Sequence, residues 1–138
     1  MEPKLTAAEV AEYLDEIFPL VSEMMTIEDV APMRARLRFH VTEVHLRPGG
    51  TVSGPTMFTL ADCAFYAATL AMIGRQAQAL TTNLNINFLK KPEPGALIAT
   101  CTLLKLGKRL AVTECAISGE GREDLYAHAT ATYSIPPR

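Results

Sequence analysis

A long apolar segment in the middle of the chain constrains the fold more than any other feature. It follows Val52-Ser53-Gly54-Pro55, runs from Thr56 to Ile73, and ends at Gly74. Proline at the first helical position gives up an N–H that has no partner there, and glycine after the last turn is a common helix stop. We therefore predict a helix over about residues 55–73, roughly 28 Å long at 1.5 Å per residue.

This predicted helix has no broad polar face. Apolar side chains occur all around it, so other structure must cover it. Its polar exceptions, Thr59, Asp62, Tyr66 and Thr69, recur at spacings of three, four and three, which places them on one stripe. Because these polar groups and Pro55 interrupt the apolar run, we predict a core helix and no membrane span.

Asp62 is the only charged side chain between Thr51 and Gly74. A carboxylate among apolar neighbours is costly unless it is paired, hydrated or used in chemistry. Two interpretations follow: a buried aspartate satisfied by a nearby hydroxyl or backbone N–H, or a catalytic base or nucleophile. Cys63, beside it, is another nucleophile candidate, although no histidine that would activate its thiol is near in the sequence.

Composition excludes several classes of function. The chain has 138 residues, enough for one domain with its own core, and a net charge of −2, which does not suit nucleic acid or an acidic membrane surface. Neither the three cysteines nor the three histidines have metal-ligand spacing, so we predict no metal and no cofactor. Free cysteines and the polar start of the chain, Met1–Thr6, predict a cytoplasmic protein without a signal peptide.

The rest of the chain predicts a second helix and a sheet. A capping box, Thr6-Ala7-Ala8-Glu9, opens an amphipathic helix over about residues 6–18, which Pro19 ends. Alternating apolar residues between turn signals predict strands at 24–31, 33–41, 80–89, 96–106, 109–118 and 124–135. Short connections after residue 95 favour antiparallel pairing. The order of elements predicts an α+β fold in which one sheet curls around the central helix.

Alternation also assigns side chains to the faces of two predicted strands. In residues 33–41, three arginines and a histidine share one face, which we interpret as a solvated face and not a phosphate site. In residues 80–89, Leu80, Thr82 and Leu84 share one face, while Thr81 and Asn83 share the other.

Several motifs, in this order and with these gaps, resemble one known family. The motifs are Gly50–Pro55, Leu60-Ala61-Asp62, Thr82–Pro92, Gly107-Lys108-Arg109 and Ala129–Tyr133. Over roughly residues 25–135 they resemble the hotdog-fold acyl-CoA thioesterases of the phenylacetate-degradation (PaaI-like) type. The resemblance implies a single domain, 1–138, with an antiparallel sheet wrapped around the long helix. It also implies a homodimer with a continuous sheet, or a homotetramer built from two such dimers.

The same resemblance implies a catalytic site and an acyl-CoA substrate. The family's catalytic carboxylate falls on Asp62, the backbone N–H that polarises the thioester carbonyl on Gly54, and a hydroxyl that helps to place water near Thr81. Two motifs depart from the family pattern. The family commonly has His-Gly-Gly where this chain has Ser53-Gly54-Pro55, and Asn where it has Arg47.

Elementary chemistry agrees with these assignments. The helix N-terminus offers N–H groups and a partial positive charge to a developing oxyanion, and since Pro55 has no N–H, Gly54 and Thr56 are the donors. Asp62 can act as a general base on water or attack directly, and the sequence does not separate the two. Gly54 and Asp62 are eight residues apart, roughly 12 Å along a helix, so they cannot meet on one carbonyl in one chain. Two antiparallel helices across a twofold axis would join them, which predicts a composite site and an obligate dimer.

The remaining candidates would bind substrate. They are Arg47, Ser53, Pro55, Tyr66, Asn83, Lys90, Lys108 and Arg109. Ser53 is interpreted chiefly as a helix cap, and Tyr66 either lines an acyl pocket or fills the core. The turn cations can meet coenzyme A phosphates or stay solvated. Two other functions remain open: an acyl-CoA binding module without catalysis, and a hotdog dehydratase or hydratase, for which His45 is the only histidine nearby.

Overall fold

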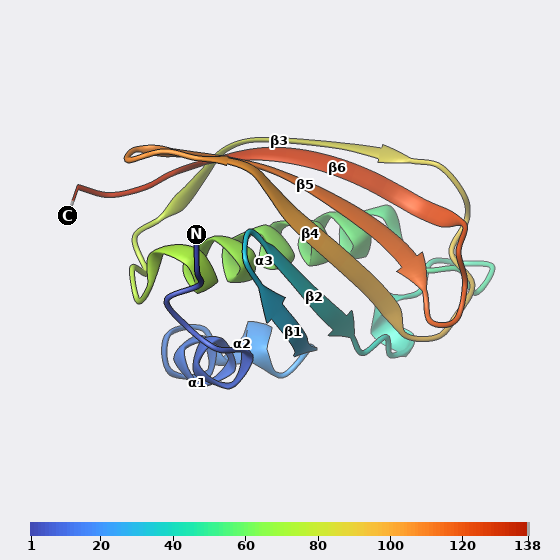
Figure 1. Ribbon diagram of the computed structural model, residues 1–138. Helices are drawn as coiled ribbons and strands as arrows, with labels where there is room; N and C mark the ends of the chain where they lie inside the picture. The colour runs from blue at the N-terminus through green and yellow to red at the C-terminus, as the bar shows by residue number, and fades with distance from the viewer. Residues whose placement is uncertain (138) are drawn as a thin grey trace.

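A computed structural model, in which residues 1–137 are described, shows one curved sheet laid over one long helix, α3 (Figure 1). The sheet has six strands in the order β1-β2-β4-β5-β6-β3, and every neighbouring pair is antiparallel. The predicted α+β hotdog fold is therefore confirmed. Arg138, the last residue of the predicted domain, lies outside the described residues.

The elements follow the predicted order. The strands are β1 (Met25–Ala31), β2 (Arg34–Phe39), β3 (Leu80–Phe88), β4 (Leu97–Leu106), β5 (Leu110–Gly119) and β6 (Leu125–Ser134). The helices are α1 (Ala7–Ile17), α2 (Pro19–Ser22) and α3 (Gly54–Ile73), with a 3-10 turn at Glu43–His45. One correction concerns Pro19. It ends α1 as predicted, but it also opens α2, because proline suits the first turn of a new helix.

The ends of α3 follow the local signals in the sequence. Ser53 is the N-cap, with an extended backbone, and its Oγ accepts a hydrogen bond from the Thr56 N–H at 3.2 Å. Gly74 ends the helix with a φ of 94°, a value that favours glycine, and its N–H donates to the Leu70 carbonyl at 2.8 Å. The predicted cap and stop are confirmed, and the helix begins one residue earlier than predicted.

Most of α3 is buried, and the sheet supplies most of its cover. Large side chains on the inner faces of the strands, such as Leu37, Leu97 and Ile117, are fully buried against it. A window of α3 is apolar enough to span a membrane, with a mean hydropathy of 1.4, but 67% of that window is buried inside the fold. The helix is therefore a core helix, as predicted.

One narrow stripe of α3 stays uncovered within the single chain. It runs along one side of the helix from Pro55 through the adjacent pair Phe58 and Thr59 to Asp62 and Tyr66, with successive turns three or four residues apart. Thr69, predicted on the same stripe, is instead fully buried. The uncovered stripe lies beside β3, an edge strand, since Gly54 lies against Phe88 and Asp62 bonds to Thr81.

A β-bulge in β3 corrects the predicted faces of that strand. Thr81 pairs with Tyr133 and Asn83 with Thr132, so Thr82 is the extra residue. The bulge shifts the alternation by one position, because two residues of β3 face one residue of β6. Thr81 therefore points toward α3, on the same side as Leu84, and not away from it.

The arginine row of β2 is a solvated face, as predicted. Arg36 and Arg38 each donate from Nε to one oxygen of Glu28 on β1, both at 3.0 Å, and Arg38 also pairs with Glu120. These cations are already matched by carboxylates, which disfavours a phosphate site there.

The cover of α3 makes a prediction about stability. Leu60 is completely buried on α3, so Leu60→Ala should lower the free energy of unfolding by about 2–5 kcal/mol. Leu104 is the matched control, because it follows buried Leu103 on the outer face of β4 and is 56% exposed. Leu104→Ala should change the value by no more than about 0.5 kcal/mol. Urea unfolding followed by circular dichroism measures both, and equal losses would contradict this account.

Candidate active site

Asp62 lies halfway along α3 on the uncovered stripe, and two hydroxyl groups from the sheet hold its carboxylate. Oδ1 accepts hydrogen bonds from Thr81 Oγ1 at 2.8 Å and from Tyr133 Oη at 2.9 Å. The same tyrosine hydroxyl is 3.0 Å from the main-chain carbonyl oxygen of Asp62. Within residues 1–137, Oδ2 accepts no hydrogen bond, so one carboxylate oxygen is fixed and the other is available.

A cavity of about 360 Å³ opens beside this carboxylate. It is lined by Ile17, Phe18, Val21, Asp62, Cys63, Tyr66, Ala77, Ala79, Leu80, Thr81 and Tyr133. The end of α1 and the start of α2 supply an apolar wall, and Asp62 is the only acidic or basic side chain among the lining residues. Such a cavity, apolar with a few convergent polar groups, suits an organic ligand.

Two stacked tyrosines form another wall of the cavity. The rings of Tyr66 and Tyr133 are 6.3 Å apart with an interplanar angle of 27°. The Tyr66 hydroxyl donates to the Ala77 carbonyl at 2.8 Å, which holds the ring at the edge of the cavity. Burial is the main cause that raises the pKa of Tyr66. The structure thus places Tyr66 in a pocket and not in the core.

Cys63 lies in the same cavity, but its environment opposes a thiolate. Burial, followed by the negative charge of Asp62, raises the pKa of the Cys63 thiol to about 12. A nucleophilic cysteine needs the opposite, a lowered pKa beside positive charge. The interpretation of Cys63 as a thiolate nucleophile is therefore wrong for this site.

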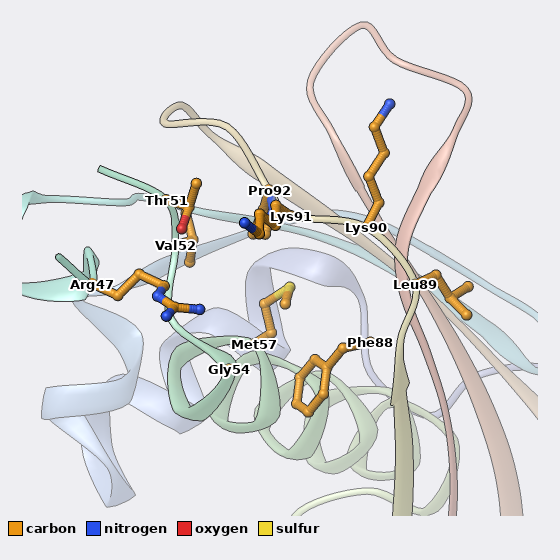
Figure 2. Close-up of a pocket in the computed structure, with 10 residues that line it drawn as sticks. All are labelled: Arg47, Thr51, Val52, Gly54, Met57, Phe88, Leu89, Lys90, Lys91 and Pro92. Atoms are coloured by element: carbon orange, nitrogen blue, oxygen red, sulfur yellow. The ribbon is translucent and has the colours of Figure 1, made fainter. Parts of the chain in front are cut away.

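The start of α3 forms a second cavity, of about 380 Å³ (Figure 2). It is lined by Arg47, Thr51, Val52, Gly54, Met57, Phe88, Leu89, Lys90, Lys91 and Pro92. Figure 2 shows the Phe88 ring beside the first turn of α3 and the Arg47 side chain extending toward the same turn. Arg47 and Lys91 give this cavity a positive rim, which suits an anionic group.

Gly54 is the donor that remains at the helix start. The Thr56 N–H is bonded to Ser53 Oγ and the Met57 N–H to the Ser53 carbonyl, while Pro55 has no N–H. Among the described residues, no acceptor is bonded to the Gly54 N–H. Of the two donors predicted, Gly54 and Thr56, the structure leaves Gly54.

The predicted site residues fall into separate groups within one chain. Asp62, Thr81 and Tyr66 share the first cavity, and Gly54, Arg47 and Lys90 share the second. Lys90 also pairs with Asp124. Ser53 and Pro55 lie beside the second cavity at the helix start, Ser53 as its cap.

Three predicted binding residues lie in neither cavity, which corrects their placement. Lys108 and Arg109 occupy the turn between β4 and β5, and Lys108 lies near Met72 and Ile73 at the far end of α3 from Gly54. Asn83 is exposed on the outer face of β3, because it alternates with Leu84, which faces the helix. In this chain, none of the three contributes to either cavity.

Tyr133 is the site residue that sequence reasoning missed. The inner-facing positions of β6 are occupied by Ala127, Ala129 and Ala131, and then by Tyr133. One large residue with a hydroxyl at the end of a row of alanines is a usable signal for a placed polar group. Phe18 was also missed, because it was assigned only to the end of a helix.

The state of Cys63 makes a testable prediction. With a pKa of about 12, its thiol ionises only at high pH, so native protein should react very slowly with iodoacetamide near pH 7.5. The rate should rise about tenfold per pH unit up to the pKa, since the thiolate is the reactive form. Peptide mapping by mass spectrometry reads out the modified residue, and protein unfolded in urea is the control for full reactivity. Rapid alkylation of the native protein near pH 7.5 would contradict the shift.

Comparison with known proteins agrees with this geometry. The family model described as the thioesterase superfamily matches residues 49–126. A predicted esterase of Saccharolobus solfataricus is 30% identical over 137 residues, which cover 96% of this chain and 87% of that protein. The crystal structure of a predicted thioesterase from Silicibacter sp. TM1040 is 46% identical, with a TM-score of 0.92 over 99% of this chain and 96% of that one.

A more distant structure shows the fold alone. The PaaI protein of Escherichia coli, from the phenylacetic acid degradation operon, is 22% identical, with a TM-score of 0.82 over 94% of this chain and 93% of that one. The family resemblance seen in the sequence motifs is confirmed, and with it the prediction of a hydrolytic enzyme. The chain belongs to the thioesterase superfamily, the hotdog-fold hydrolases.

Proposed function

We propose that this protein hydrolyses acyl-CoA thioesters, with Asp62 activating water and the N–H of Gly54 of the partner subunit polarising the carbonyl. The observation that carries the proposal is the Asp62 carboxylate, the only charge lining an otherwise uncharged cavity, with one oxygen held and the other available. A carboxylate held in this way costs free energy, and a role in catalysis explains why the site retains it.

The proposal requires a homodimer, and one uncovered side of the chain suits such a dimer. The uncovered stripe of α3 and the free edge of β3 lie side by side, and the large apolar residues Phe58, Leu80 and Phe88 there are 42%, 58% and 52% exposed. A second copy would cover these side chains and pair the edge of β3. Across a twofold axis the two α3 helices would run antiparallel, which would bring Asp62 toward Gly54 of the partner subunit.

In the proposed reaction, the thioester carbonyl oxygen accepts the hydrogen bond of the free N–H at a helix start. The partial positive charge there stabilises the oxyanion that forms when water attacks the carbonyl carbon. Asp62 takes the proton of that water on Oδ2, the carbon–sulfur bond breaks, and the coenzyme A sulfur leaves with the proton. In the alternative route, Oδ2 itself attacks and forms an anhydride that water then hydrolyses.

The two cavities suggest where the parts of the substrate lie. The positive rim formed by Arg47 and Lys91 suits the phosphates of coenzyme A, whereas Lys90 is already paired with Asp124. The apolar cavity beside Asp62 suits a small acyl or aryl group against Phe18 and Tyr66. The reaction as written uses only protein groups and water, so we propose no cofactor. The free thiols of Cys63, Cys101 and Cys115 support a cytoplasmic location.

The dehydratase alternative receives no support from His45. Its Nδ1 is 2.8 Å from the Thr42 N–H, which it caps, and its ring contacts the edge of Phe39. His45 lines neither cavity, so it is not placed to share a proton with Asp62.

The proposal predicts loss of activity without loss of fold in Asp62→Asn. The amide keeps the size of the side chain but cannot accept a proton, so thiol release should fall by about 10²–10⁴-fold. Thiol release from a panel of acyl- and aryl-CoA esters, followed with a thiol-reactive dye, measures this. Asp29→Asn, on the exposed edge strand β1, is the matched control and should retain wild-type rates.

The results of this experiment separate the candidate functions. Wild-type rates in Asp62→Asn would overturn the role of Asp62. A wild-type protein that binds acyl-CoA in calorimetry but releases no thiol from any ester in the panel would instead be a binding module.

The composite site predicts that two inactive variants restore each other. Gly54→Pro removes the free N–H, and the extended backbone of Ser53 (φ −73°, ψ 153°) suits the position before proline. This variant should lose about 10²–10³-fold in turnover, as expected for the loss of an oxyanion donor.

Co-expression of Gly54→Pro with Asp62→Asn under two different tags then tests the geometry. Dimers carrying both tags hold one intact site out of two, so they should regain about half of the wild-type rate. Gly54→Ala, which keeps the N–H, is the control for the change of side chain. Mixed dimers as inactive as their parents would show that the site is not shared between subunits.

A further inference from the structure

We propose that Tyr133 is a positioning residue: its hydroxyl, together with that of Thr81, fixes Oδ1 of Asp62 so that Oδ2 faces the reacting atoms. This inference rests on the proposed function and gives a role to Tyr133, which belongs to one of the family motifs but had no role assigned to it. It concerns the orientation of the carboxylate, whichever of the two routes Asp62 takes.

The geometry around Oδ1 is that of a clamp. Thr81 Oγ1 and Tyr133 Oη approach the same oxygen, at 2.8 and 2.9 Å, from two neighbouring strands. Thr81 and Tyr133 are cross-strand partners, so their side chains project side by side toward α3. Two donors on one oxygen resist rotation of the carboxylate about its last torsion, a broad torsion in the absence of hydrogen bonds.

Tyr133 is the more rigid of the two donors. It lies on β6, which is paired on both sides, and its side chain is only 2% exposed. Its ring stacks on Tyr66, and its hydroxyl also lies 3.0 Å from the main-chain carbonyl of Asp62, which ties strand and helix together. Thr81 instead lies on the edge strand, next to the bulge at Thr82.

The tyrosine stays a donor under ordinary conditions. Burial is the largest cause that raises the pKa of Tyr133; the neighbouring Thr81 hydroxyl lowers it, and the negative charge of Asp62 raises it further. The other titratable groups lining the cavity, Cys63 and Tyr66, also have raised pKa values and stay uncharged at neutral pH.

Tyr133→Phe tests the proposal, because it removes only the hydroxyl. A loosened carboxylate should lower kcat by about 10–100-fold with KM unchanged and only a small fall in Tm, since positioning acts on the chemical step and the lost hydrogen bonds contribute little to the fold. Thr81→Val should show the same signature, and Thr81→Ser, which restores the hydroxyl, should recover most of the rate. These two variants keep the proposal testable should Tyr133→Phe fail to fold.

Tyr126→Phe is the matched control. It removes another buried tyrosine hydroxyl from the same strand, but one that lies against Gly119, outside the cavity of Asp62. Its kcat should stay at the wild-type value. An equal fall in both tyrosine variants would assign the effect to general loss of stability and overturn the proposal.

Crystal structures of the wild type and Tyr133→Phe provide a readout that does not depend on activity. The Asp62 carboxylate should hold one orientation in the wild type and a different or second orientation in the variant, with the main chain of α3 unchanged. An unmoved carboxylate, or an unchanged kcat, would each overturn the role of Tyr133. Failure of the wild type to release thiol would instead overturn the proposed function, and the orientation of Asp62 would still decide this inference.

Discussion

The structure depends on one constraint: a twenty-residue helix that is apolar on nearly every side must be kept from water. One sheet satisfies it by curving, since its inner face offers a row of apolar residues to the helix from every central strand. The sheet has two edges, so the cover is incomplete, and α3 keeps one open stripe beside β3. Everything proposed about catalysis lies along that stripe. Because the sheet buries the rest of α3, a polar side chain on this helix can contact a ligand only along the open stripe.

The fold could be predicted from the sequence because its signals are local and agree with one another. Ser53, Pro55 and Gly74 mark the ends of the helix by the same backbone chemistry that the structure shows. Strand positions follow from alternation, which reports a half-buried face. Alternation read from one strand fails where pairing with the neighbouring strand contains an irregularity. The bulge at Thr82 exists only in the pairing of β3 with β6, so reading β3 alone placed Thr81 on the wrong face.

The site could be predicted only in part. Asp62 stands out in the sequence because it is a lone charge in an apolar run, and Gly54 because a helix begins there. Tyr133 carries a weaker signal, because its place after a row of alanines marks it only as a placed polar group and its partner lies 71 positions away in the sequence. Lys108 and Arg109 show the converse: turn cations suit phosphates by chemistry, but within one chain this turn lies at the opposite end of the helix from Gly54. The sequence shows which residue types could bind or react with a substrate, but the fold determines which of them lie close together.

The bulge at Thr82 also divides β3 into two parts whose side chains make different contacts. Beyond it, Leu84 and Ile86 pack under the sheet, and their sizes are constrained by the core. Before the bulge, the side chain of Thr81 is constrained by its hydrogen bond to the Asp62 carboxylate. A change of residue at 81 need not disturb the packing at 84 and 86, because the irregular residue between them absorbs small shifts of the backbone. The residue at position 81, beside the Asp62 carboxylate, can thus vary while the core packing of Leu84 and Ile86 stays the same. A change in the chemistry of the site at this position therefore need not lower the stability of the fold.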